Sequence, residues 1–282
     1  MTDNIEMREY WDRRAELWDR RATALEGASD PYGESALMKL NLQPGERVID
    51  IGCGPGAATI TIAGLVGPKG EAVGIDISTE MIKAAEARAK LAGVDNTKFV
   101  VADAQTDPLG TGFDAVFSRF GVMFFPDPAA AFTNIVAALH PGGRLAAMAW
   151  GPVGANPWMF LPTMTAAQVL GADLPLPDPG APGPFSLADD TLVDDLLTRA
   201  GFRDINIDVV EGKREIGDVP GVNDVRVLLE TCPLAEPFLA ADDDTQQRVI
   251  DALTEAFAPY KTDGGWAVPG MARCITAVRG SA

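Results

Sequence analysis

The segment Val48-Ile49-Asp50-Ile51-Gly52-Cys53-Gly54-Pro55-Gly56 decides the fold that we expect for this chain. Its apolar residues, which surround a single acid, are typical of a strand buried in a parallel sheet. The glycines that follow tolerate backbone angles that other residues avoid, and a missing Cβ lets a ligand lie against the main chain. The helix expected from residue 57 would direct its free amide groups at that ligand. The segment therefore indicates a turn that binds a nucleotide-type cofactor.

The spacing of the glycines leaves the kind of cofactor open. Residues 52–57 satisfy the G-x-G-x-x-G/A pattern of dinucleotide-binding turns, and Asp76 lies where a ribose-binding acid is expected. An NAD(P)-dependent oxidoreductase is therefore one hypothesis, although no Tyr-x-x-x-Lys or histidine element accompanies it. An ordinary tight turn also fits the glycines alone. Asp50 inside the strand end, and a third glycine that comes one residue early, argue against a turn that binds pyrophosphate.

These last two features resemble the first motif of the class I S-adenosylmethionine (SAM) methyltransferases. Segments that resemble the family's second, third and fourth strands follow in order at 73–78, 100–104 and 113–120, and the segment at 139–145 resembles the turn into the fifth strand. The set covers about residues 40 to 150 and is most similar to the small-molecule group near the ubiquinone/menaquinone biosynthesis methyltransferases. The resemblance implies an α/β fold that is Rossmann-like and doubly wound, with a mostly parallel seven-stranded sheet and helical cap elements.

The same resemblance assigns residues to each part of SAM. Asp76 would accept two hydrogen bonds from the ribose diol, and Asp103 with the amide of Ala104 would hold the adenine. Asp50 and the region of the Ser118 carbonyl would receive the ammonium of the methionine end. The cofactor-binding residues implied in the core are Asp50, Gly52, Cys53, Gly54, Gly56, Asp76, Ile77, Asp103, Ala104 and Ser118. The product of methyl transfer would be S-adenosylhomocysteine (SAH).

Residues 7–25 carry apolar side chains at helical spacing, among them Tyr10, Trp11 and Trp18. Two interpretations stay open: a helix that packs on the core, or a helix that also covers the cofactor. In the second interpretation Tyr10 and Trp18 join the cofactor-binding residues.

Methyl transfer from a sulfonium is an in-line displacement, so it requires positioning in a dry, weakly polar pocket. Most aromatic residues of this chain are expected to belong to the core. The candidates for the substrate pocket are Phe120, Met123, Phe124, Trp150 and Trp158. No catalytic residue is assigned; Tyr10 and Arg119 are candidates, the latter because it could steer an anionic or carbonyl-bearing acceptor. The single histidine, His140, precedes a Pro-Gly-Gly turn and is not expected to act as a base.

The fourth strand ends in Ser118-Arg119-Phe120-Gly121. It lacks the Asn/Asp-Pro-Pro-aromatic signature of the enzymes that methylate amide or exocyclic amino nitrogens. This departure argues against nucleobase and glutamine acceptors.

The alternation of strands and helices predicts how the chain is organised. We expect a helical cover at 1–40, a SAM-binding core at 41–150, and the remainder of the sheet at 151–282 with cap insertions at 151–184 and 212–270. Strands are expected at 46–51, 71–76, 97–102, 113–118, 144–150, 203–210 and 273–279. Helices are expected at 57–66, 79–92, 129–139, 158–170, 187–200, 221–231 and 243–258.

The composition limits the partners. Lys and Arg number 23 against 40 Asp and Glu, a formal net charge of −17, which disfavours nucleic acid and anionic membrane surfaces. The 3 cysteines are scattered, so neither a zinc site nor a disulfide framework is expected, and no metal is assigned. This fits a cytoplasmic protein without a membrane span. We expect an enzyme with a small-molecule substrate, with a homodimer as a further hypothesis. A SAM-binding protein without methyl transfer is the remaining alternative.

Overall fold

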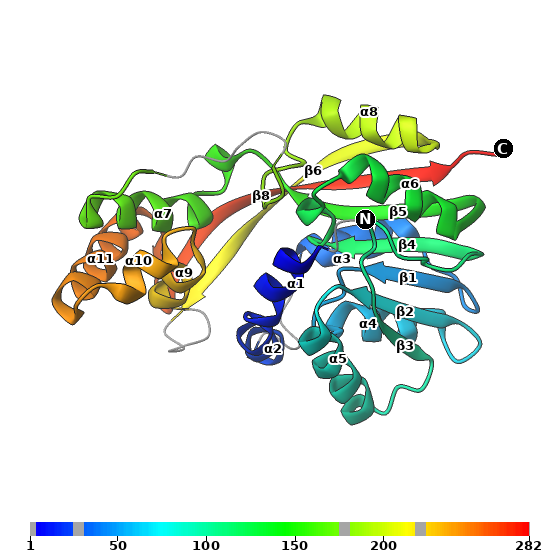
Figure 1. The fold of residues 1–282 in the computed structure, drawn as a ribbon, viewed down its shortest axis with the longest axis horizontal. Helices are drawn as coiled ribbons and strands as arrows, with labels where there is room; N and C mark the ends of the chain where they lie inside the picture. Colours follow the sequence, from blue (N-terminus) through cyan, green and yellow to red (C-terminus); the bar gives the residue numbers. More distant parts are fainter. Residues whose placement is uncertain (1–3, 25–30, 175–180, 218–223, 282) are drawn as a thin grey trace. The chain divides into compact units, whose positions relative to one another are not determined.

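The computed structural model describes residues 4–24, 31–174, 181–217 and 224–281 (Figure 1). The chain forms two compact units. The first unit consists of residues 1–149, 180–210 and 272–282, and the second consists of residues 150–179 and 211–271. In the described part of the chain, no helix is both long and apolar enough to cross a membrane.

The frame of the fold is a sheet with the strand order β3-β2-β1-β4-β5-β8-β6. The strands are β1 (Arg47–Ile51), β2 (Glu71–Asp76), β3 (Thr97–Val101), β4 (Phe113–Arg119), β5 (Leu139–Trp150), β6 (Phe202–Gly217) and β8 (Gly265–Arg279). The first five pair in parallel, and the short β7 (Lys261–Thr262) pairs antiparallel with β8. The order reverses between β1 and β4, and ligands of such sheets bind beyond the carboxyl ends of the strands at this point.

Local signals mark both ends of α5 (Thr79–Ala92), a helix of the first unit. Ser78 accepts a hydrogen bond from the amide of Met81 and so caps α5, which ends at Gly93 in the left-handed region. The helices are α1 (Ile5–Asp12), α2 (Ala15–Ala24), α3 (Pro31–Leu40), α4 (Ala57–Val66), α5 (Thr79–Ala92), α6 (Pro128–Ala138) and α8 (Asp190–Ala200), with a 3₁₀ helix at Val122–Phe124. Helices α1 and α2 pack against α5, and α6 packs against α8.

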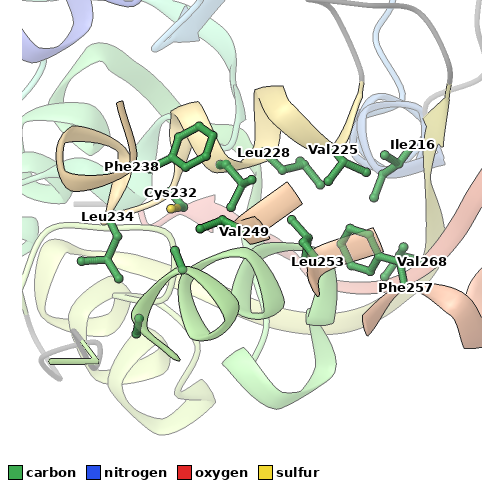
Figure 2. Close-up of a cluster of buried hydrophobic side chains, with 13 residues drawn as sticks. Ile216, Val225, Leu228, Cys232, Leu234, Phe238, Val249, Leu253, Phe257 and Val268 are labelled. Atoms are coloured by element: carbon green, nitrogen blue, oxygen red, sulfur yellow. The ribbon is translucent and has the colours of Figure 1, made fainter. Parts of the chain in front are cut away.

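The second unit has its own apolar core. Its helices are α7 (Pro157–Leu170), α9 (Val225–Thr231), α10 (Ala235–Ala240) and α11 (Asp243–Ala256), with short 3₁₀ helices at Val153–Ala155 and Ala258–Tyr260. Figure 2 shows Leu228, Phe238 and Leu253, which come from α9, α10 and α11, in one buried cluster with Val268 of β8. Asn156 fixes the chain before α7, because its side chain both donates to and accepts from the backbone of Met271 at 3.0 Å.

The expected fold class is confirmed, since the main path of the sheet has seven strands and they are mostly parallel. Several boundaries were wrong. The strand expected at 144–150 begins earlier, because β5 starts at Leu139. Residues 175–180 of the segment expected as a cap insertion at 151–184, and residues 221–223 of the helix expected at 221–231, lie outside the described part. The helix expected at 7–25 is interrupted at residues 13–14, and residues 25–30 lie outside the described part. The strands expected at 203–210 and 273–279 are longer, so β6 and β8 extend into the segment expected as a cap insertion at 212–270. The role of 151–184 and 212–270 as a cap stays a prediction.

Candidate cofactor site

The three glycines of the glycine loop, Gly52–Gly56, all have positive φ but differ in what surrounds them. A Cβ at Gly52 would lie 2.8 Å from the Cα of Gly121, and a Cβ at Gly56 would lie 2.8 Å from that of Ala85. A Cβ at Gly54 would meet no protein atom within 4 Å. Gly52 and Gly56 are therefore required by packing, whereas Gly54 leaves open space beside the main chain.

The turn after β4 is joined to the glycine loop. Ser118, which is fully buried, donates from Oγ to the carbonyl oxygen of Ile51 at 2.8 Å. Phe120 has a φ of 65°, which a bulky residue rarely adopts, and this turn brings Gly121 against Gly52. The sequence had indicated Ser118, but it gave no reason to single out the contact made by Gly121.

Asp50 lies at the end of β1 and is 2% exposed. Its Oδ2 accepts a hydrogen bond from Thr59 Oγ1 at 2.7 Å. Burial raises the pKa of Asp50 to about 6, against the opposing effects of the Thr59 hydrogen bond and the charge of Arg119. A cation or a donor that approached this carboxylate would favour its ionised form.

Asp76 lies at the end of β2 and holds the glycine loop. Its Oδ2 accepts from the amide of Gly54, and its Oδ1 accepts from the amide of Ser78, both at 2.9 Å. Burial raises the pKa of Asp76 to about 6, although these amide hydrogen bonds lower it. A carboxylate offers about four lone-pair positions, so about two remain for a ligand. The next residue, Ile77, is half-buried.

Asp103 follows β3 and stabilises a tight turn. Its Oδ1 accepts from the amide of Gln105 at 2.9 Å, while its own amide donates to Asp107 Oδ2 at 2.8 Å. Ala104 is buried, and its carbonyl accepts from Asn134 Nδ2 at 2.9 Å. The expected acids Asp50, Asp76 and Asp103 thus lie at the carboxyl ends of three adjacent strands.

Cys53 is buried within the glycine loop. Burial raises the pKa of its thiol well above the ordinary value, and the charges of Asp76 and Asp50 add to the effect. The thiol therefore stays protonated and does not act as a nucleophile at neutral pH.

An aromatic cluster, made of Tyr10, Trp11, Trp18 and Phe124, joins the N-terminal helices to the turn after β4. Trp11 is its centre: edge-to-face contacts place its ring 5.2 Å from Tyr10, 6.2 Å from Trp18 and 4.9 Å from Phe124. Trp18 is 37% exposed, so it is not a core residue. Because Trp11 belonged to a broad apolar stripe, the sequence did not distinguish it from its neighbours.

The expected pocket residues fall into two groups. Phe120, Met123 and Phe124 lie in the turn after β4 of the first unit, where Met123 is buried. Trp150 and Trp158 belong to the second unit, and their rings meet edge-to-face at 5.1 Å. Phe124 belongs to the aromatic cluster through its ring contact with Trp11. That the five residues form a common pocket stays a prediction.

The part of the chain that carries these strand ends is similar to known proteins. Residues 42–159 match a family model described as a methyltransferase domain. This segment of the chain is therefore similar to a methyltransferase domain.

Curated proteins that are methyltransferases match the same region of the chain. The aklanonic acid methyltransferase DauC of Streptomyces sp. (strain C5) is 41% identical over 103 residues, which are 36% of this chain and 47% of that protein. The demethylmenaquinone methyltransferase of Geobacillus kaustophilus (strain HTA426) is 33% identical over 113 residues, or 40% and 48% of the two chains. The chain spans about half the length of these curated relatives. The matches confirm the resemblance to methyltransferases of the quinone-biosynthesis group.

Solved structures share the fold at low sequence identity. Phosphoethanolamine N-methyltransferase 2 of Haemonchus contortus, in complex with S-adenosyl-L-methionine, is 18% identical with a TM-score of 0.53, and the match covers 88% of this chain and 52% of that one. The cyclase SpnF is 17% identical with a TM-score of 0.57 and covers 98% and 96%. Because one is a methyltransferase and the other a cyclase, the fold alone does not determine the reaction.

Proposed function

We propose that this protein is a SAM-dependent methyltransferase that moves a methyl group, by in-line displacement, to an O, C or N nucleophile of a small hydrophobic or aromatic metabolite. The observation that carries the proposal is the placement of Asp50, Asp76 and Asp103 at three adjacent strand ends beside the glycine loop, inside a segment similar to a methyltransferase domain. The names of the two relatives, which specify aklanonic acid and demethylmenaquinone, support a small-molecule acceptor.

The residues present fit SAM better than a dinucleotide. Asp50 is buried directly before the glycine loop, where a carboxylate would attract the ammonium of SAM and repel a pyrophosphate. Asp76 retains lone pairs for a ribose diol, and the open space at Gly54 admits a ligand against the main chain. Asp103 and the amide of Ala104 would hold the adenine.

The bound cofactor would supply a methyl group on a sulfonium, which is already a good leaving group. The chain then has to orient the acceptor and exclude water. The aromatic cluster offers an apolar surface next to the turn after β4, and Arg119 could hold an anionic or carbonyl-bearing acceptor. Tyr10 and Arg119 remain the candidates for a catalytic role.

We also propose that the protein acts in the cytoplasm, as a homodimer, without a nucleic-acid or membrane partner. The net charge of −17 supports the absence of polyanionic partners. Cys53, Cys232 and Cys274 are buried and unpaired, which supports a reducing compartment. Sedimentation analysis of the purified protein tests the oligomeric state.

Turnover tests the proposed activity. The purified protein is incubated with SAM and a panel of small aromatic and quinone-like acceptors, and SAH is quantified by mass spectrometry. We expect SAH formation with at least one small acceptor and none with DNA or RNA. A protein that binds SAH but forms none with any acceptor would support the non-catalytic alternative.

His140 should not contribute to catalysis. It lies at the start of β5, where Leu139 pairs with Phe113 at the amino end of β4, away from the strand ends that carry the acids. Its Nε2 lies 3.1 Å from Asp114 Oδ1. We expect His140→Ala to keep turnover within about threefold of the parent, whereas a true general base contributes roughly 10²–10⁴-fold. A rate loss in that larger range would contradict the mechanism.

The affinity for SAH should rise with pH between about 5 and 7. The pKa values of Asp50 and Asp76 are raised to about 6 in the free protein, and the donors of the ligand would lower both in the complex. Binding therefore releases protons near pH 6, and affinity falls as pH decreases through that value. Calorimetry in two buffers of different ionisation enthalpy measures this proton release. An affinity that is flat over this range would show that neither carboxylate contacts the ligand.

A further inference from the structure

Two acids of the N-terminal helices reach residues that border the glycine loop. Asp12, the last residue of α1, accepts from Ser78 Oγ at 2.6 Å through its Oδ1. The amide of Ser78 in turn donates to Asp76 Oδ1 at 2.9 Å. Ser78 therefore links helix α1 to Asp76, the acid proposed to bind the ribose.

The second acid reaches the glycine loop through Arg88 of α5. Nη2 of Arg88 donates to Asp19 Oδ1 at 2.6 Å and to the Asp19 carbonyl at 3.3 Å. Nε of the same guanidinium donates to the carbonyl of Pro55, the residue between Gly54 and Gly56, at 3.1 Å. One side chain thus joins α2 to the centre of the glycine loop.

The burial of Arg88 distinguishes this bond from the surface ion pairs of the chain. The Arg88 side chain is 12% exposed, so its hydrogen bonds are poorly screened by water. On the same helix, Lys83 pairs with Glu80 at 2.8 Å, but these side chains are 64% and 50% exposed and join α5 only to itself. Exposed pairs of this kind contribute little to stability. Lys83 therefore provides a matched control for Arg88.

We propose that Arg88 is a positioning residue that couples the docking of α2 to the conformation of the glycine loop. The glycine loop needs external support, because all three of its glycines occupy the left-handed region and lack side chains that could hold them. The same guanidinium contacts the Pro55 carbonyl and the Asp19 carboxylate, so the bond to Asp19 helps to hold the guanidinium where it supports the glycine loop. Binding of the cofactor to the glycine loop and docking of α1 and α2 therefore favour each other, and this coupling is reciprocal. The inference rests on the proposed function, since the ligand is SAH or SAM.

The test compares Arg88→Gln, Asp19→Asn and the control Lys83→Gln with the parent. Calorimetry measures SAH affinity, and hydrogen exchange of residues 5–24 is measured with and without SAH. We expect SAH to protect residues 5–24 in the parent and in Lys83→Gln. Arg88→Gln should lower SAH affinity at least about tenfold and abolish the protection by SAH. Asp19→Asn should weaken the same protection, with a smaller loss of affinity because the bond to Pro55 remains.

The outcomes separate the inference from the proposed function. A parent protein that binds no SAH contradicts the proposed function. A parent that binds SAH while Arg88→Gln binds it equally well overturns the positioning role. Weaker binding by Arg88→Gln with unchanged protection of residues 5–24 overturns the coupling. If Arg88→Gln does not fold, the test rests on Asp19→Asn, which should fold because the Asp19 side chain is 43% exposed. If SAH then protects residues 5–24 of Asp19→Asn as strongly as those of the parent, the inference is contradicted.

Discussion

Gly54→Ala is expected to lower SAH affinity by about 10- to 100-fold while the protein stays folded. The new Cβ would meet no protein atom within 4 Å, so it would occupy the space in which we propose that the ligand lies against the main chain. Overpacking of this kind costs about 1–3 kcal/mol, and each 1.4 kcal/mol corresponds to roughly tenfold in affinity. Calorimetry with SAH and a thermal melt measure the two effects.

Gly93→Ala is the matched control for this substitution. Gly93 ends α5 with a φ of 66°, close to the 52° of Gly54, and a Cβ there would also meet no atom within 4 Å. Both variants should therefore lose about 1–2 kcal/mol of stability for a left-handed alanine. Equal SAH affinity in the two variants would show that the ligand does not lie on Gly54.

Asp76→Ala should lower cofactor affinity at least about tenfold. The substitution removes the proposed acceptor for the ribose diol, and hydrogen bonds to a charged group contribute about 1.5–3 kcal/mol each. It also leaves the amides of Gly54 and Ser78 without their acceptor, which should destabilise the protein by about 1–3 kcal/mol for each buried donor. Calorimetry and a thermal melt are again the measurements.

Asp76→Asn separates the two roles of this carboxylate. The amide oxygen can still accept one of the two backbone hydrogen bonds, but the negative charge is lost. We expect the stability of Asp76→Asn to lie between that of the parent and that of Asp76→Ala. Its SAH affinity should be almost as low as that of Asp76→Ala. Unchanged SAH affinity in both variants, together with lower melting temperatures, would show that Asp76 only supports the glycine loop.

The sequence predicted the first five strands and the acids at their ends because those signals are local. Buried parallel strands are short apolar runs, and Asp50 and Asp76 directly precede turns that are marked by glycine or by a helix cap. The extension of β6 to Gly217 was not predicted, because that part of the strand carries many exposed charged residues. The interruption at residues 13–14 was missed because neither glycine nor proline marks it.

The contacts that complete the candidate site could not be predicted, because they join distant parts of the chain. Arg88 and Asp19 are 69 residues apart, and Ser118 bonds to Ile51 across 67 residues. Each contact depends on the packing of one element against another, which spacing along the sequence does not encode. A residue such as Gly121 resembles any turn glycine until the approach of Gly52 is known.

The central claim is that the glycine loop with Asp50, Asp76 and Asp103 binds SAM, and calorimetric titration of one protein preparation with SAH and with NAD⁺ tests it most directly. The account predicts saturable binding of SAH, with higher affinity at pH 7 than at pH 5, and no measurable binding of NAD⁺. Saturable binding of NAD⁺ without binding of SAH would contradict the account.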